Sequence, residues 1–570
     1  MPDRDALSVP ATTEPATNPA AGVVLGTEDA APLDFWVGVL DEKLVQLDDL
    51  VVVEAPVPGG GKVTFYGIVD QVRKRYDGAE FDSDAFRAAE GVLPVEISYA
   101  AHVQTTRIDP EVFMPPNPGT PVSVVHGEDF QKALYIDRME RKIPIGMTRT
   151  KEPVFANLEF LDGTRGAHAS FSGVSGVATK TSYATFLLYS LFHSDALGLE
   201  SANTKAIIFN VKGEDLLWLD KPNARLNDEA RRAYEGLALP AGPFQSVGLF
   251  APVRKNSDVP MPDTGTRHVG VSPYCWTLRQ FAAERLLRFA FADAEDARSQ
   301  IGFVITQVER ELERASRQGD PNDPTLELHG NRLASFADLV ETVSNNLDAM
   351  TRNAASGTLD AFRRRLDAAA RHMGHLVRGD ADAVQHRIDW DTNQVTVIDI
   401  HKLHSTAQMF VVGVVLKRMM ERKEAQGTAR PLVFVVLDEL NKYAPRSGWS
   451  PIQDVLLDIA ERGRSLGVSL FGAQQTASEV ERRVVANAAL KVVGRLDAAE
   501  AERGEYGFLT PVARRRATIL SPGTMIVSQP EIPTPILLHF PFPSWATRES
   551  EAAATSSAAE EDPFTRLGGQ

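Results

Sequence analysis

The chain has 570 residues, of which 43% are hydrophobic and 24% charged, so it can fill two or three cores and has a globular composition. Its formal net charge of −16 excludes a surface coated with basic patches, although a few Arg and Lys side chains could still line a pore. The single cysteine, Cys275, excludes an intramolecular disulfide and is expected to be a packed apolar residue. No run approaches the ~18 apolar residues of a membrane span. No signal peptide is evident either, so we expect a cytoplasmic protein without a membrane segment.

The first part of the chain predicts a disordered tail followed by a small β domain. Residues 1–21 are rich in Pro, Ala and Thr and have few large apolar groups. From 22 to 108, short β-type segments such as VQLDDLVVVE and KVTFYGIVDQV follow one another without helices between them, which predicts a small barrel or sandwich. Residues 109–149 are expected to be a linker and lead-in, because five prolines lie between 109 and 122.

The pattern from 150 to 548 predicts an α/β core with a mostly parallel sheet covered on both faces, because strands and helices alternate. The strand candidates are residues 167–173, 205–211, 394–400, 431–439 and 468–475. Residues 278–378 are rich in Ala, Leu, Arg and Glu at helical spacing, apart from the breaker GDPNDPTLELHG. We therefore expect a helical insertion there, and a second disordered tail at 549–570.

The stretch SFSGVSGVATKTSY, residues 170–183, partly matches the phosphate-binding loop pattern. The two positions that should be glycine hold a valine and a threonine, so the strict pattern fails. Gly173 and Gly176 remain, and Lys180 and Thr181 precede an expected amphipathic helix. The alternative is a flexible surface turn.

A loop one residue longer than the strict pattern could still supply what nucleotide phosphates need. A nucleotide-phosphate site requires converging backbone N–H groups, a lysine ammonium, a hydroxyl for Mg²⁺ and a helix amino terminus. We expect a nucleotide to contact Gly173, Val174, Ser175, Gly176, Val177, Ala178, Thr179, Lys180, Thr181 and Ser182.

The segment PLVFVVLDEL places Asp438 and Glu439 at the carboxyl end of a buried strand, where open α/β sheets bind ligands. Asp438, together with Thr181, is expected to hold Mg²⁺, and Glu439 to polarise the water that attacks the γ-phosphate of ATP. The alternative is that the two carboxylates only begin a turn.

Two further groups of polar residues lie around the next strand. Gln474 and Gln475 end it, and an amide there could sense the γ-phosphate or merely cap the strand. Arg462 and Arg464 precede it, and in a ring ATPase one such arginine reaches the neighbouring subunit's γ-phosphate. A solvated arginine pair is the alternative.

The order of the loop, IIFNVKGED, VTVIDI, VLDELNKYAP, ERGRSLGVSLFGAQQTASEV and NAALKVVGRL resembles the HerA-type ATPases of the HerA/FtsK group of P-loop ATPases. The preceding β segments resemble that family's small barrel, the HAS barrel. The resemblance covers roughly residues 22–545 and implies a RecA-like ATPase core. It also implies ATP and Mg²⁺ as cofactors and a homohexameric ring that translocates double-stranded DNA, beside a NurA-type nuclease or an antiviral effector.

The resemblance also assigns roles to particular residues. It places the phosphate-loop lysine and hydroxyl on Lys180 and Thr181, and the Walker B pair on Asp438 and Glu439. The sensor glutamine falls on Gln475 rather than Gln474, the arginine finger on Gly463-Arg464, and a second arginine near the subunit boundary on Arg495. One departure besides the long loop is Asn210, where relatives usually have aspartate.

Two other functions remain open at this stage. One is a ring scaffold that binds nucleotide with weak turnover and organises a partner effector; retention of Glu439 argues against it. The other is a conjugation or secretion motor of the same superfamily. If DNA threads a pore, Lys212 and Lys442 are candidate contacts, although both could be solvated surface lysines.

Overall fold

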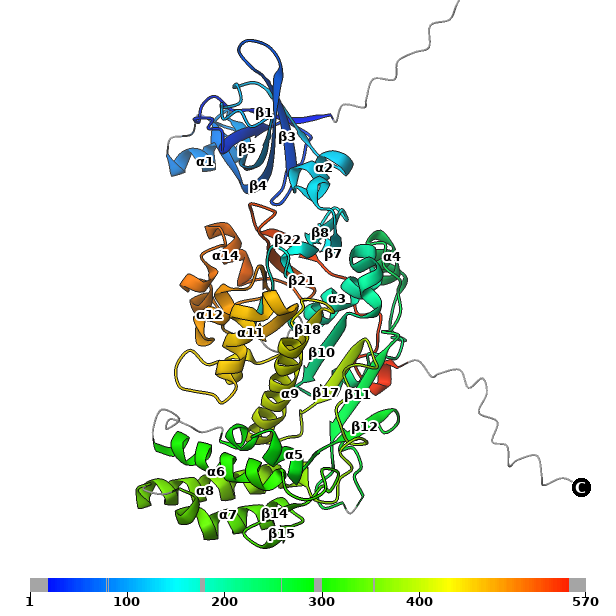
Figure 1. Ribbon diagram of the computed structural model, residues 1–570. Coiled ribbons are helices and arrows are strands. Elements are labelled where there is room, and N and C mark those ends of the chain that lie inside the picture. The colour runs from blue at the N-terminus through cyan, green and yellow to red at the C-terminus, as the bar shows by residue number, and fades with distance from the viewer. Residues whose placement is uncertain are drawn as a thin grey trace, which may run out of the picture. The chain divides into compact units, whose positions relative to one another are not determined.

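The computed structural model describes residues 19–552, apart from 78, 80, 175–179, 258, 292–299 and 352–353 (Figure 1). The chain forms two compact units, one up to Met139 with Glu531–Thr534, and one from Glu140 onward. The predicted tails lie largely outside the described residues. Their described parts include the start of the first strand at Ala20 and a short 3-10 helix at Glu549–Glu551.

The first unit is a closed antiparallel barrel with strand order β1-β2-β5-β4-β3-β6. Its core includes Phe35, Phe65 and Val103, each at most 1% exposed. The sequence left a barrel and a sandwich open, and the pairing of β6 with both β1 and β3 closes the barrel. The elements are β1 (Ala20–Val24), β2 (Asp34–Val39), β3 (Leu50–Pro56), β4 (Lys62–Asp77), α1 (Asp82–Ala89), β5 (Glu96–Asp109), β6 (Pro121–Val124) and α2 (Gly127–Ala133).

The closing strand β6 comes from the range 109–149 that the sequence predicts as linker and lead-in. Its proline, Pro121, is the first residue of the strand, a position where a missing N–H is tolerated. The proline content therefore led to a linker prediction for a segment that is a strand. This strand pairs with both edge strands of the sheet formed by β1 to β5 and so closes the barrel.

The second unit is built on a twelve-stranded sheet in the order β12-β11-β17-β10-β18-β19-β9-β20-β21-β22-β7-β8. The pairs from β12 to β20 are parallel, and those from β20 to β8 are antiparallel. The bounds are β7 (Lys142–Met147), β8 (Pro153–Asn157), β9 (Ala169–Ser172), β10 (Lys205–Asn210), β11 (Val247–Pro252), β12 (Val271–Tyr274), β17 (Val395–Asp399), β18 (Val433–Leu437), β19 (Val468–Gln474), β20 (Leu490–Val493), β21 (Thr524–Ser528) and β22 (Ile536–His539). All five predicted strands are present, and β11 and β12 extend the parallel part beyond them.

Helices cover both faces of the parallel strands, as Figure 1 shows for α3 and α9. Along β18, Val433 and Val435 join the core beneath α9 and α11, whereas Phe434 contacts Phe471 on the other face. This alternation follows from the two-residue period of a strand. The helices are α3 (Lys180–His193), α4 (Asp228–Gly236), α9 (Ser405–Gln426), α10 (Leu440–Tyr443), α11 (Gln453–Leu466), α12 (Arg482–Ala486), α13 (Ala498–Ala501) and α14 (Pro511–Ala517).

The helix after the phosphate-loop candidate differs from the amphipathic helix that the sequence predicts. Ten consecutive residues of α3, Tyr183–Phe192, are buried. The sheet covers one side, and aromatic rings cover another, since Tyr183 packs on Phe540 and Tyr189 on Trp545, each with ring centroids 5.1 Å apart. A helix enclosed in this way needs no polar face.

The helical insertion lies at one end of the sheet (Figure 1) and shares its core with α9, where Trp276 packs on Phe410. The breaker that divides its helices contains the first strand and the turn of a small hairpin. The elements are β13 (Trp276–Thr277), α5 (Leu278–Ala283), α6 (Gln300–Ser316), β14 (Leu326–Leu328), β15 (Asn331–Leu333), α7 (Phe336–Met350), α8 (Ser356–Met373) and β16 (Val377–Arg378). The predicted architecture, an α/β core on a mostly parallel sheet with a small barrel and a helical insertion, is confirmed.

Across the described part of the chain, none of the helices combines the length and the apolar character that crossing a lipid bilayer requires.

Candidate active site

The phosphate-loop candidate begins where β9 ends, and neighbouring strands hold its first two residues. Gly173 N donates to the carbonyl of Gln474 at 3.2 Å, and Val174 N donates to that of Arg495 at 2.7 Å. A Cβ at position 173 would lie 3.2 Å from the Arg495 carbonyl oxygen, so a larger residue would crowd the start of the loop. The predicted Ser175, Gly176, Val177, Ala178 and Thr179 lie outside the described residues.

Lys180 opens α3 with its ammonium group buried. The residue is 5% exposed, and within the described part of the chain Nζ has no hydrogen-bond partner. Burial lowers the pKa of Lys180, although the carboxylate of Asp438 opposes this shift. Because an unpaired buried cation is costly, the position fits an anionic ligand such as a phosphate group.

Thr181 and Asp438 meet beside this lysine. The Thr181 hydroxyl donates to Asp438 Oδ2 at 3.0 Å, while Asp438 Oδ1 accepts the backbone N–H of Glu439 at 2.8 Å. A hydroxyl and one carboxylate fit Mg²⁺, which usually keeps several waters and takes further oxygens from phosphates. Among the described residues there is no group of three or more His, Cys, Asp or Glu that could hold a metal ion by itself.

Glu439 has a strained backbone, and two side chains hold one oxygen of its carboxylate. Its φ of 58° and ψ of 42° lie in the left-handed region, which costs a non-glycine residue about 1–2 kcal/mol and is frequent at functional sites. Its carboxylate forms an ion pair with Lys212, and its Oε1 accepts Gln475 Nε2 at 3.3 Å. Burial alone would raise the pKa of Glu439, but the hydrogen bond and charge of Lys212 outweigh it and the pKa is lowered.

The sequence offered Lys212 as a candidate DNA contact, but in the structure this lysine pairs with Glu439. Lys212 Nζ contacts Glu439 and lies 3.7 Å from Asp438 Oδ2, so its charge belongs to the site. Lys442, the other candidate, is exposed on α10. An ion pair between residues so far apart in the sequence has no local signal.

The two neighbouring glutamines have different places. Gln474 is fully buried, and its Nε2 donates to the hydroxyls of Ser170 at 2.8 Å and Ser172 at 2.9 Å across the sheet. Gln475 lines the cleft and reaches Glu439. Only Gln475 therefore occupies a position from which it could act on a ligand.

A cleft of about 510 Å³ lies over Lys180, Thr181, Ser182, Asp438 and Gln475. Clefts of this size are typical small-molecule sites. The segment after β22 lines the same cleft through Pro543, Trp545, Thr547 and Arg548.

The segment after β22 is fixed in place by one asparagine and by aromatic rings that pack at an angle. Asn223 Nδ2 donates to the carbonyls of Pro543 at 3.1 Å and Trp545 at 3.2 Å, and the Trp545 ring packs 5.1 Å from that of Phe244. No sequence motif marks the cleft residues of this segment, because only tertiary packing brings them to the cleft.

Asn210 also lines the cleft, and a buried network explains its amide. Asn210 Nδ2 donates to Asp399 Oδ1 at 2.8 Å and to the Gly213 carbonyl at 2.8 Å. Asp399 also bonds His401 Nδ1 at 2.8 Å, and this hydrogen bond raises the pKa of His401. An aspartate at 210 would place a second carboxylate against Asp399, so the amide suits this chain.

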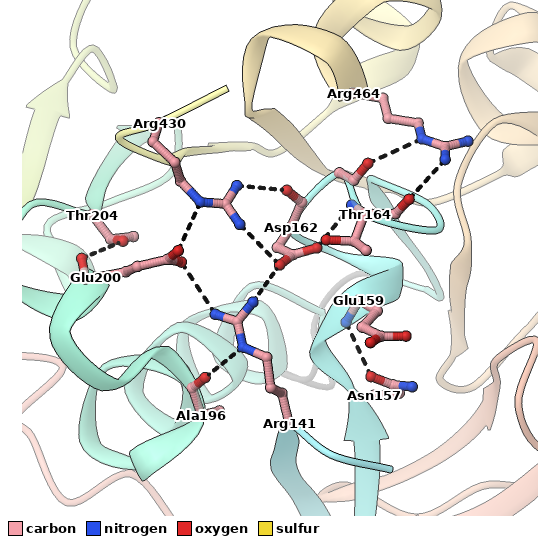
Figure 2. Close-up of polar contacts among 11 residues, drawn as sticks. Arg141, Asn157, Glu159, Asp162, Thr164, Ala196, Glu200, Thr204, Arg430 and Arg464 are labelled. Carbon is pink, nitrogen blue, oxygen red and sulfur yellow. Dashed lines mark hydrogen bonds and ion pairs between the residues drawn. The ribbon is translucent and has the colours of Figure 1, made fainter. Parts of the chain in front are cut away.

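The predicted arginine finger is anchored by the backbone of a neighbouring loop (Figure 2). Arg464 donates from Nε to the Gly163 carbonyl at 3.1 Å and from Nη2 to the Thr164 carbonyl at 2.8 Å. Its loop is itself fixed, because the buried carboxylate of Asp162 binds Arg141 at 2.6 Å and Arg430 at 3.2 Å. A Cβ at Gly163 would lie 2.6 Å from the Arg464 carbonyl oxygen, so this loop needs glycine there.

Arg464 lies at the opposite edge of the sheet from Lys180. It precedes β19, whereas Gln475 follows it, and the seven residues of β19 span about 20 Å at ~3.3 Å per residue. Arg464 therefore does not reach the cleft of its own subunit. Arg462 is engaged on the surface by Asp458 and Glu424. Arg495 is exposed next to the loop, where its Nε donates to the Thr518 carbonyl at 3.2 Å.

Comparison with known proteins gives no family-model match and no match among curated proteins. Among solved structures, the chain is similar to the unbound bacterial conjugative coupling protein TrwB, with TM-score 0.47, 12% identity, and coverage of 75% of this chain and 94% of that one. TrwB in complex with ADP and Mg²⁺ gives TM-score 0.46, 12% identity, and coverage of 74% and 94%. VirB4 of Thermoanaerobacter pseudethanolicus gives TM-score 0.43, 15% identity, and coverage of 70% and 96%. At these values, function has to be argued from the residues of the chain itself.

Proposed function

We propose that the second unit binds ATP with Mg²⁺ in the cleft and hydrolyses it. The observation that carries this proposal is the buried ammonium of Lys180, which lies beside the Thr181–Asp438 pair and has no hydrogen-bond partner among the described residues. Lys180 would hold β- and γ-phosphate oxygens, and the residues from Gly173 to Ser182 would surround the phosphates. Thr181 and Asp438 would hold Mg²⁺, which neutralises phosphate charge when bound.

Glu439 is the group that would orient a water and accept its proton. Its ionised carboxylate is held by Lys212 and Gln475, so it is fixed in direction as well as in charge. Glu439→Gln should leave nucleotide binding intact and slow turnover by about 10²-fold or more. The surface change Glu421→Gln, at a carboxylate paired only with Lys417, serves as the control. Equal ATPase rates for Glu439→Gln and the parent would remove Glu439 from the mechanism.

We further propose that the active protein is a homohexameric ring in which Arg464 acts on the neighbouring subunit's nucleotide, with Arg495 near the same boundary. The support is that Arg464 is anchored at the sheet edge opposite its own cleft. Arg464→Ala should abolish turnover and spare nucleotide binding, and mixing it with Glu439→Gln should change rates across subunits. Arg462→Ala, two residues away and paired on the surface, is the control. A fully active monomer would contradict the ring.

The specific function that we propose is that of a HerA-type motor on double-stranded DNA in the cytoplasm, working with a NurA-type nuclease or another effector. This rests on the resemblance of the ordered motifs, from the loop to the Gln475 strand. The test is the ATPase rate with linear, circular and hairpin-blocked duplexes across a salt series. A threaded ring requires stimulation that depends on a free end and falls with salt. Equal rates with and without every form of DNA would contradict DNA translocation.

A nucleotide-binding scaffold is the second candidate, and one observation favours it. The Lys212 ammonium already pairs with the carboxylate that would accept the proton. If this pair persists with nucleotide bound, ATP would bind tightly with little turnover, and Lys212→Met would raise the rate. A lower rate in Lys212→Met would favour the motor instead.

A further inference from the structure

A second cleft in the ATPase unit has a volume of about 500 Å³, and half of its lining residues are cations. Four basic side chains converge on it, and we call it the basic cleft: Arg446 from the loop after α10, Arg482 from α12, Lys491 from β20 and Arg503 from the segment after α13. One carboxylate, Glu505, also lines it. Convergence from four elements distinguishes this cleft from an ordinary run of surface charge.

The lining of the basic cleft carries more positive than negative charge. Arg446 Nη1 donates to Glu505 Oε1 at 2.8 Å, so the carboxylate is already paired. In the described ranges, the side chains of Arg482, Lys491 and Arg503 have neither a hydrogen bond nor an ion pair. Four cations and one carboxylate leave three positive charges in a chain whose net charge is −16.

Lys491 shows that this arrangement is more than solvated surface. It lies within β20, in register with Ser170 of β9, and its ammonium sits 5.2 Å from the centroid of the Phe508 ring. Burial lowers the pKa of Lys491. By contrast Arg483, next to Arg482, pairs with Glu461 and Glu481. Of these two neighbours, the one that lines the cleft, Arg482, is the one without a partner among the described residues.

We propose that the basic cleft is a second anion site, separate from the ATP cleft, that binds phosphate groups carrying no metal ion. Arginine forks match phosphate oxygens bidentately, and the ammonium of Lys491 adds a point charge at the base. The only lining carboxylate is occupied by Arg446, so nothing there would hold Mg²⁺. The ligand is therefore a nucleic-acid backbone or a free phosphorylated molecule. The two clefts share no lining residue.

The test uses the full chain with the Lys180→Met change, without ATP, so that neither phosphate binding in the first cleft nor motor activity affects the result. The double variant Arg482→Ala/Arg503→Ala removes two exposed cations, and Lys491→Met removes the third while keeping its stem. Arg483→Ala is the matched control, because it removes one arginine from the same helix outside the cleft. Binding of a fluorescein-labelled duplex and of inorganic pyrophosphate is measured over a salt series.

We expect the double variant to lose at least about tenfold in affinity, and the control to lose far less. If duplex is the ligand, the slope of log K against log salt should fall by about 0.9 for each phosphate contact removed. Loss of duplex binding identifies the backbone as the source, and loss of pyrophosphate binding alone identifies a small ligand. Unchanged binding of both probes, an equal loss in Arg483→Ala, or no binding by the parent would overturn the proposal, whether or not ATP is hydrolysed.

Discussion

Replacing Lys180 with Met should affect folding and nucleotide binding in opposite directions. Without nucleotide, the change removes a buried ammonium that has no partner among the described residues, which should stabilise the protein by about 1–3 kcal/mol. With nucleotide, it removes about two charge-assisted hydrogen bonds of about 1.5–3 kcal/mol each. The loss of roughly 3–6 kcal/mol corresponds to roughly 10²- to 10⁴-fold weaker binding.

The sign of the pH dependence gives this prediction a second readout. Burial lowers the pKa of Lys180 below its ordinary 10.5, so between these two values the unfolded chain holds more protons. The stability of the parent therefore rises with pH in that window, and the advantage of Lys180→Met should shrink as the pH approaches 10.5.

Urea midpoints of the nucleotide-free proteins and ADP titrations measure the two effects. Lys417→Met is the control, because Lys417 is paired with Glu421 at 2.7 Å and its loss should bring no gain in stability. A Lys180→Met protein that is less stable than the parent, or that binds ADP equally well, would refute the reasoning.

Two further predictions separate roles that lie close together. Gln475→Ala should slow ATP hydrolysis about tenfold or more with ADP affinity kept. Gln474→Ala should instead lower the free energy of unfolding by about 1–3 kcal/mol, seen as a lower urea midpoint, because two buried hydroxyls lose a partner. Reversed effects of the two changes would show that the sensor is misassigned. A hydrogen bond to Asp399 raises the pKa of His401 above 6.5. The parent should therefore be more stable than His401→Gln below pH 6.5, and this advantage should be lost as the pH rises through the raised pKa. A difference in urea midpoints that does not change with pH would contradict this.

Local patterns identified the centre of the sheet but not its edges. The run PLVFVVLDE is apolar enough to be read as a buried strand, and β18 is that strand. β11 and β12 went unpredicted, because their short segments lie between loops and are strands only through their pairing with β17 and with each other. The same holds for Pro121–Val124, where proline content favoured a linker although the barrel needed a sixth strand.

The site shows the same division between local and tertiary information. Lys180, Thr181 and Asp438 were found because loop, lysine and strand-end carboxylate each leave a local pattern, and the structure brings them together. Their roles stay predictions. For Lys212 the sequence left a DNA contact and a solvated surface lysine open, because a lysine after a strand says nothing of its partner. That partner, Glu439, lies far away in the sequence.

The segment Pro543–Arg548 makes the proposed nucleotide cleft depend on the order of synthesis. The barrel strands lie within the first 124 residues, so they can pair early on the ribosome. The part of the cleft wall that Pro543–Arg548 forms, in contrast, exists only after translation has passed Arg548. A chain cut short after β20 would carry the loop, the lysine and the carboxylates without that wall. Full-length chains would then bind nucleotide more tightly than chains that ended early, and the shorter chains would compete poorly for ATP.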